Sequence, residues 1–178
     1  NVAIGYNAGS EVTTGVQNTL IGALAGDALT IGANNVAVGY QALSAEDEHG
    51  TNVAVGSQAL KSLNAAGNGM NTAVGNQAGY SSTTAIENVL VGAAAGYALT
   101  TGSNNVAIGR KALMTEDAHG KNVAIGHEAL TAQNAGADAR NVAIGYQSGL
   151  DLTTGTKNVF IGNSAGEKVT EGQYNTLL

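Results

Sequence analysis

Two short acidic segments, each ending in a histidine, are the residues of this sequence best suited to chemistry. The first comprises Glu46, Asp47, Glu48 and His49, and the second, seventy residues further on, comprises Glu116, Asp117 and His119. Carboxylates and an imidazole in one loop are typical ligands of a metal ion, and the same groups act as general acids and bases. Two equal half-sites are unusual for an enzyme, whereas duplication of a longer block produces them directly. We therefore interpret both segments as solvated acidic loops.

Other catalytic arrangements are missing from the sequence. It contains no Gly-x-Ser-x-Gly elbow, no phosphate loop with its Lys-Ser/Thr pair and no cysteine. Calcium-binding glycine repeats need regularly spaced Asp residues, and this sequence has none. Hexapeptide acyltransferases need an aliphatic residue every six positions, whereas here the aliphatic pair recurs only once per coil. His127 stands alone, and we give it no role. We predict that the chain is not an enzyme and has no catalytic residue, metal site or cofactor.

The composition excludes further classes of protein. The chain has 178 residues with 26 Gly, one Phe and no Trp, so it lacks the large side chains of an ordinary core. Its net charge is −6, and its seven Lys and Arg residues are scattered, which argues against a nucleic-acid partner. No apolar run is long enough to predict a membrane span. The chain starts within a pattern, so we expect a fragment or a processed piece.

A repeated pentapeptide, Asn-(Val/Thr)-(Ala/Leu/Phe)-(Ile/Val)-Gly, organises the whole chain. Its copies begin at Asn1, Asn18, Asn35, Asn52, Asn71, Asn88, Asn105, Asn122, Asn141 and Asn158, and a truncated copy begins at Asn175. Three spacings of 17 residues and one of 19 make a larger unit of 70. We predict one domain over 1–178, with 70-residue repeats at 1–70 and 71–140 and a partial one at 141–178.

This period and composition predict an all-β fold, a parallel β-solenoid of about ten 17-residue coils. Glycine closes each short strand, and stacked Asn amides are expected to form a ladder along the axis. Side chains alternate across a strand, so the Ile/Val position and the Val/Thr position two residues before it share one face. We expect that face to be the structural core: Val2, Ile4, Ile21, Val38, Val55, Val74, Val91, Ile108, Ile125, Ile144 and Ile161.

The strand position between the Val/Thr and Ile/Val positions points to the opposite face and is also apolar. It carries Leu20, Leu90 and Phe160 among the alanines. A strand that is apolar on both faces is usually covered on both. We therefore predict self-association that buries this column, joined by a second column of leucines: Leu43, Leu60, Leu113 and Leu130.

The phrases NVAIGYNAG, NVAVGSQAL and NVAIGYQSG resemble the head repeats of trimeric autotransporter adhesins and of related bacteriophage tail-fibre proteins. The resemblance covers essentially the whole chain. It implies a left-handed parallel β-roll and a side-by-side homotrimer, located outside the cell on a bacterial surface or a phage virion. The repeat of 17 residues is longer than in most adhesin heads and is more typical of fibre-like proteins.

These features predict a structural or adhesive fibre segment, a rigid rod that displays loops for attachment to a host or surface. The exposed column after the pentapeptide carries Tyr6, Tyr40 and Tyr146, which are candidate contacts for a cell-surface glycan or protein receptor. One alternative is a purely architectural component of an extracellular filament. An ice-binding solenoid is a third possibility, because Thr recurs at one position of many coils, although Asp47, Asn64, Asp117 and Asn134 interrupt the column.

Overall fold

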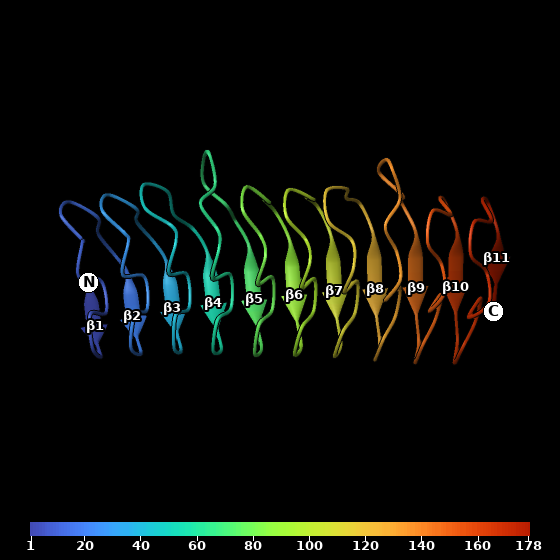
Figure 1. Cartoon of the computed structure of the whole chain (residues 1–178), viewed down its shortest axis with the longest axis horizontal. Helices are drawn as coiled ribbons and strands as arrows, with labels where there is room; N and C mark the ends of the chain where they lie inside the picture. Colours follow the sequence, from blue (N-terminus) through green and yellow to red (C-terminus); the bar gives the residue numbers. More distant parts are fainter.

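A computed structural model describes all residues, 1–178, as an all-β solenoid without helices. Eleven parallel strands form one sheet in sequence order (Figure 1). The strands are β1 (Val2–Ile4), β2 (Thr19–Ile21), β3 (Val36–Val38), β4 (Val53–Val55), β5 (Thr72–Val74), β6 (Val89–Val91), β7 (Val106–Ile108), β8 (Val123–Ile125), β9 (Val142–Ile144), β10 (Val159–Ile161) and β11 (Thr176–Leu177). The predicted fold class is therefore confirmed, and each pentapeptide supplies one strand.

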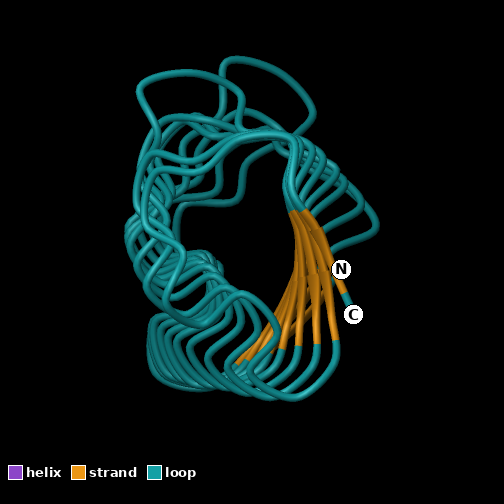
Figure 2. Ribbon diagram, turned by 90° about the vertical axis from the view of Figure 1, so that its right-hand side faces the viewer, coloured by secondary structure: helices purple, strands orange, loops and turns teal.

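Each strand pairs with the next at equivalent positions, as in Ala37 beside Ala54. Down the rod, the strands occupy one side of the coil and loops form the rest, while the two termini lie at opposite ends (Figures 1 and 2). Of 103 backbone hydrogen bonds, 83 lie outside the strand ladder, so the loops are bonded from coil to coil as well.

The face of each strand that points into the coil is the Ala/Leu/Phe face. Ala37, Ala107 and Leu90 are fully buried. Our prediction of the core column was wrong, because none of its side chains is buried: Val2, Ile4, Ile21, Val38, Val55, Val74, Val91, Ile108, Ile125, Ile144 and Ile161 all lie on the outer face. Since both faces are apolar, alternation alone does not distinguish them. One side chain per strand points into the coil, and the β-branched pair on either side of it points outward.

Large and small side chains compensate one another inside the coil. Leu20, Leu90 and Phe160, which we expected on the outside, are fully buried. Each lies in a coil that has Gly six residues later, where an added Cβ at Gly96 would come within 2.8 Å of Leu90. The leucines expected at an interface are buried as well, in coils whose strand carries Ala: Leu43, Leu60, Leu113 and Leu130. The order of these pairs repeats every four coils and accounts for the 70-residue unit.

The regularly spaced Asn residues form the expected hydrogen-bonded ladder. The Oδ1 atom of Asn18 accepts the N–H of Asn35 at 2.9 Å, and its Nδ2 atom donates to the carbonyl of Gly32 at 2.8 Å. The pattern continues to Asn175, whose N–H donates to Oδ1 of Asn158 at 2.9 Å. Each Oδ1 from Asn1 to Asn158 thus accepts the N–H of the next asparagine in the ladder, and most Nδ2 groups donate to a backbone carbonyl, whereas Asn122 Nδ2 has no partner.

The two longer coils differ from the rest by a projecting loop. One protrudes between β4 and β5 and the other between β8 and β9 (Figures 1 and 2). Gly67 and Gly136 lie in these loops and have nothing within 4 Å of an added Cβ. The additional residues therefore leave the stack without disturbing the register of the strands.

Candidate interaction surface

The outer strand face is an apolar stripe that extends along the sheet. It consists of the Val/Thr and Ile/Val positions of β1 to β11, and we call it the outer stripe. Even in the middle of the rod these side chains remain accessible, with Val89 exposed by 38% and Ile108 by 37%. Exposed apolar patches of this kind mark protein–protein contacts in soluble proteins.

The predicted tyrosines border the outer stripe but do not form one cluster. Tyr6 is 74% exposed, and Tyr40 and Tyr146 are each 50% exposed. They follow the glycine that ends β1, β3 and β9, so several coils separate Tyr146 from the other two. The structure therefore provides separate aromatic contacts.

Tyr146 belongs to a polar network that the sequence did not reveal. Its ring stacks on His127, with centroids 5.3 Å apart, and Arg110 Nε donates to His127 Nε2 at 3.0 Å. Glu128 accepts bonds from Arg110 at 3.2 Å and from Gln147 at 2.9 Å. The Gln147 bond is the main cause that lowers the pKa of Glu128. His127, to which we gave no role, thus connects neighbouring coils.

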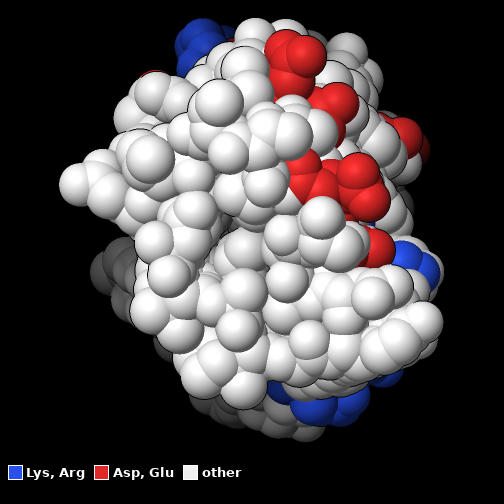
Figure 3. Space-filling view, turned by 90° about the vertical axis from the view of Figure 1, so that its left-hand side faces the viewer, with Lys and Arg blue, Asp and Glu red and all other residues white.

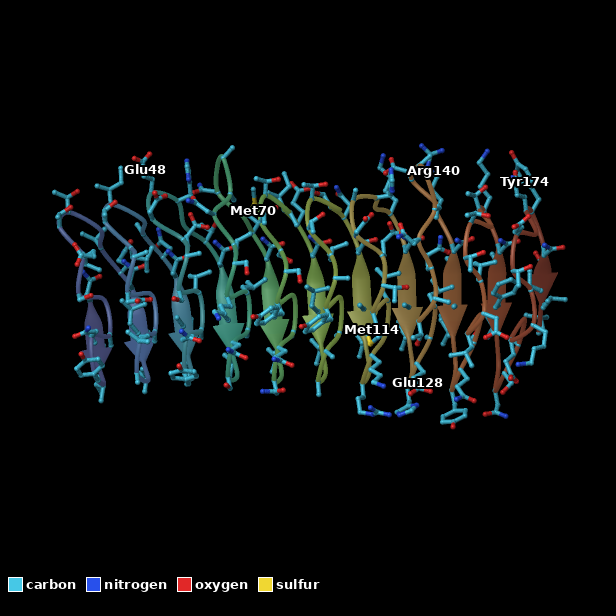
Figure 4. All side chains as sticks on the ribbon, in the orientation of Figure 1. Glu48, Met70, Met114, Glu128, Arg140 and Tyr174 are labelled. Atoms are coloured by element: carbon cyan, nitrogen blue, oxygen red, sulfur yellow. The ribbon has the colours of Figure 1, made fainter.

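The acidic segments lie in loops on the opposite edge of the rod from Glu128. Figure 4 shows Glu48 along one edge and Glu128 along the other, and Figure 3 shows acidic side chains gathered on one side at the β1 end. Our interpretation of solvated loops was wrong for Glu46 and Glu116, because both side chains are 0% exposed. Burial is the main cause that raises the pKa of both carboxyls, that of Glu116 to about 7.

The recurrent threonines use their hydroxyl groups within the protein. Thr30 Oγ1 donates to the carbonyl of Asp47 at 3.0 Å, and Thr100 Oγ1 donates to that of Asp117 at 2.8 Å. Similar bonds join Thr13 to Thr30 at 3.1 Å. These hydroxyl hydrogen bonds connect adjacent coils, so the threonine column has a structural role.

Comparison with protein-family models, with curated proteins and with solved structures gives no match for this chain. The surface has no pocket. None of its segments forms a helix of the length and apolarity needed to cross a membrane.

Proposed function

We propose that this chain is a non-enzymatic fibre segment whose copies associate side by side through the outer stripe. The observation that carries the proposal is the exposure of β-branched side chains along a parallel sheet, from Ile4 at 59% to Ile161 at 42%. Parallel sheets are usually covered on both faces, and one coil covers only its inner face. A second copy offers a surface with the same spacing between strands, so apolar rows meet apolar rows along the rod.

The resemblance to adhesin heads and tail fibres supports three copies around a common axis. It also supports a location outside the cell, on a bacterial surface or a phage virion. In this arrangement the rod holds its loops and exposed tyrosines away from the axis, where they contact a cell-surface glycan or protein receptor. Three copies of each weak contact would raise the overall affinity.

A purely architectural filament is the second candidate, and the regularity of the repeat favours it. The 70-residue unit recurs with the same strand spacing, and its strands stack in register along the rod. Growth of the purified chain into long fibres would support this role over receptor attachment.

Self-association is tested by light scattering together with circular dichroism. We expect a β-rich particle of three chain masses. The double variant Val89→Lys with Ile108→Lys places two charges in the outer stripe and is expected to give β-rich monomers, because buried unpaired charges oppose association. Asn68→Lys with Asn134→Lys, both in exposed loop positions, adds the same charge and is expected to leave the trimer intact. A folded wild-type monomer at micromolar concentration would contradict the proposal.

A further inference from the structure

The two acidic loops place a glutamate at an interior position where the preceding coil has a leucine. Glu46 occupies the interior position that Leu29 and Leu63 fill in the coils on either side. Glu116 takes the same position after Leu99. Burying a carboxylate without compensation is costly, so buried carboxylates are normally paired, protonated or bound to a metal ion.

The polar atoms around each glutamate are only partly used by the protein. Glu116 Oε1 accepts the N–H of His119 at 3.2 Å, whereas its Oε2 atom has no hydrogen-bond partner. The Nδ1 atom of His119 is also buried and has no partner, and it lies 3.5 Å from Glu116 Oε1. A buried carboxylate with one unpartnered oxygen therefore lies beside an unpartnered imidazole nitrogen in one loop.

The earlier copy repeats this arrangement. His49 Nδ1 is likewise buried without a partner and lies 3.8 Å from Glu46 Oε1, which accepts the N–H of His49 at 3.2 Å. Glu46 Oε2 also accepts the N–H of Ala65 from the projecting loop at 3.4 Å. A buried glutamate thus lies close to an unpartnered histidine nitrogen in both loops. The two copies differ in that Glu46 Oε2 is hydrogen-bonded and in that the next coil carries Leu63 after Glu46 but Gln133 after Glu116.

An aspartate completes a three-ligand set in each copy. One ligand atom from each of Glu116, Asp117 and His119 lies within 4.8 Å of the others, as does one from each of Glu46, Asp47 and His49. Zinc binds imidazole nitrogen and carboxylate oxygen at about 2.0–2.2 Å in tetrahedral geometry, which places neighbouring ligand atoms about 3.4 Å apart. The 3.5 Å separation of Glu116 Oε1 and His119 Nδ1 fits such an ion, and an Asp117 oxygen belongs to the same cluster, within 4.8 Å of the other ligand atoms.

We propose that each Glu-Asp-x-His loop binds one Zn²⁺ ion, through the Glu116, Asp117 and His119 side chains in one copy and the Glu46, Asp47 and His49 side chains in the other. Water completes the coordination on the outer side. The ion neutralises the buried carboxylate and fixes the loop beside the projecting loop of the next coil. The sites are structural, and they do not depend on the proposed trimer.

The test is a calorimetric titration of the purified chain with ZnCl₂ after treatment with chelator. We expect two ions per chain, one per chain for Glu116→Gln, and none for Glu46→Gln with Glu116→Gln. The matched control is His127→Gln, which removes a histidine next to Glu128 outside the clusters and should leave two sites.

Two results would overturn the proposal: no binding at millimolar Zn²⁺, or binding that persists in the double glutamine variant. If that variant fails to fold, His49→Gln with His119→Gln replaces it, since these side chains are 30% and 29% exposed. Substitution with Co²⁺ provides an independent readout, because the visible absorption of a tetrahedral site should appear in the wild type and be absent from the histidine variant. Absence of that band from the wild type would contradict tetrahedral coordination.

Discussion

At the scale of single residues, the asparagine at the start of each coil has the most defined task. Asn105 accepts the N–H of Asn122 at 3.0 Å and donates to the carbonyl of His119 at 3.3 Å. It is fully buried, so no water replaces the amide when it is removed. An unsatisfied buried backbone group costs about 1–3 kcal/mol.

We therefore expect Asn105→Ala to destabilise the fold by about 2–4 kcal/mol, because it leaves two backbone groups unpaired. The measurement is the shift of the urea midpoint followed by circular dichroism. Asn64→Ala is the matched control, since that side chain is exposed and makes no hydrogen bond, and it should change the midpoint very little. Equal shifts in the two variants would contradict a ladder that supports the backbone.

The buried glutamates predict a dependence of stability on pH. A carboxyl whose pKa is higher in the folded state than in the unfolded state favours folding most when it is protonated. For Glu116, with an ordinary value of 4.5 and a folded value of about 7, stability should fall as pH rises through this window and then level off. The decrease is about 3 kcal/mol, since one unit of pKa corresponds to about 1.4 kcal/mol.

Glu116→Gln should remove this contribution, so that with chelator present the variant is more stable than the wild type at pH 8. Urea midpoints between pH 5 and pH 8 measure the effect. Glu48→Gln, an exposed carboxyl of the other acidic loop, should retain the wild-type slope, and a similar loss of slope there would refute burial as its cause.

The sequence contained a signal for these glutamates that a reading of the loop alone misses. Their local context is acidic and polar, which favours a solvated loop. Aligned over successive coils, however, Glu46 falls in a column with Leu29 and Leu63. Burial in a solenoid is set by position within the coil, so the column predicts it better than the neighbours in sequence. The approach of Glu116 Oε1 to His119 Nδ1, at 3.5 Å, is a matter of side-chain geometry, and no column encodes it.

At the scale of the strand, the position and length of every element followed from the repeat, but the inner face did not. Side chains alternate between the two faces of a strand, so this alternation by itself does not say which face points into the coil. The signal that distinguishes them is size: positions with compensating large and small residues, such as Leu90 with Gly96, must share a closed space. Uniform β-branched positions, such as Val106 and Ile108, have no such compensation and fit an open surface.

The glycine after each strand provides a test of how tightly the coils stack. Gly109 has a φ of +134°, and an added Cβ would lie 2.3 Å from the carbonyl oxygen of Gly126 in the next coil. Both the backbone angle and the contact disfavour any side chain there. Gly109→Ala is therefore expected to destabilise the protein by about 3 kcal/mol or more, through strain and displacement of the coil.

The control for this variant is Gly136→Ala in a projecting loop, where an added Cβ meets nothing within 4 Å. Its free energy of unfolding, obtained from urea denaturation, should stay within about 0.5 kcal/mol of the wild-type value, as for most surface substitutions. If Gly109→Ala were as well tolerated as Gly136→Ala, the result would contradict the close approach of neighbouring backbones at the end of each strand.

At the scale of the whole molecule, the rod is a stack in which each coil contacts its neighbours, so its length is adjustable in units of the repeat. Met70 and Arg140 occupy the same place before Asn71 and Asn141, with φ values of 49° and 53°. Joining Met70 directly to Asn141 therefore recreates a junction that the chain already contains. The packing order of large and small residues is also preserved, because one complete unit of four coils is removed.

We expect the deletion of 71–140 to give a folded, β-rich rod that is shorter by about 19 Å, four coils at the spacing of neighbouring strands. Small-angle X-ray scattering measures the loss in maximum dimension, and circular dichroism measures the retained β-structure. A deletion of 80–140 removes a similar length but joins Gly79 to Asn141, which takes most of the loop from one coil. This variant should unfold at the junction and lose more β-structure than the first deletion, because the shortened coil cannot return to the start of the next strand. Equal folding of both deletions would show that a complete coil between successive strands is not required.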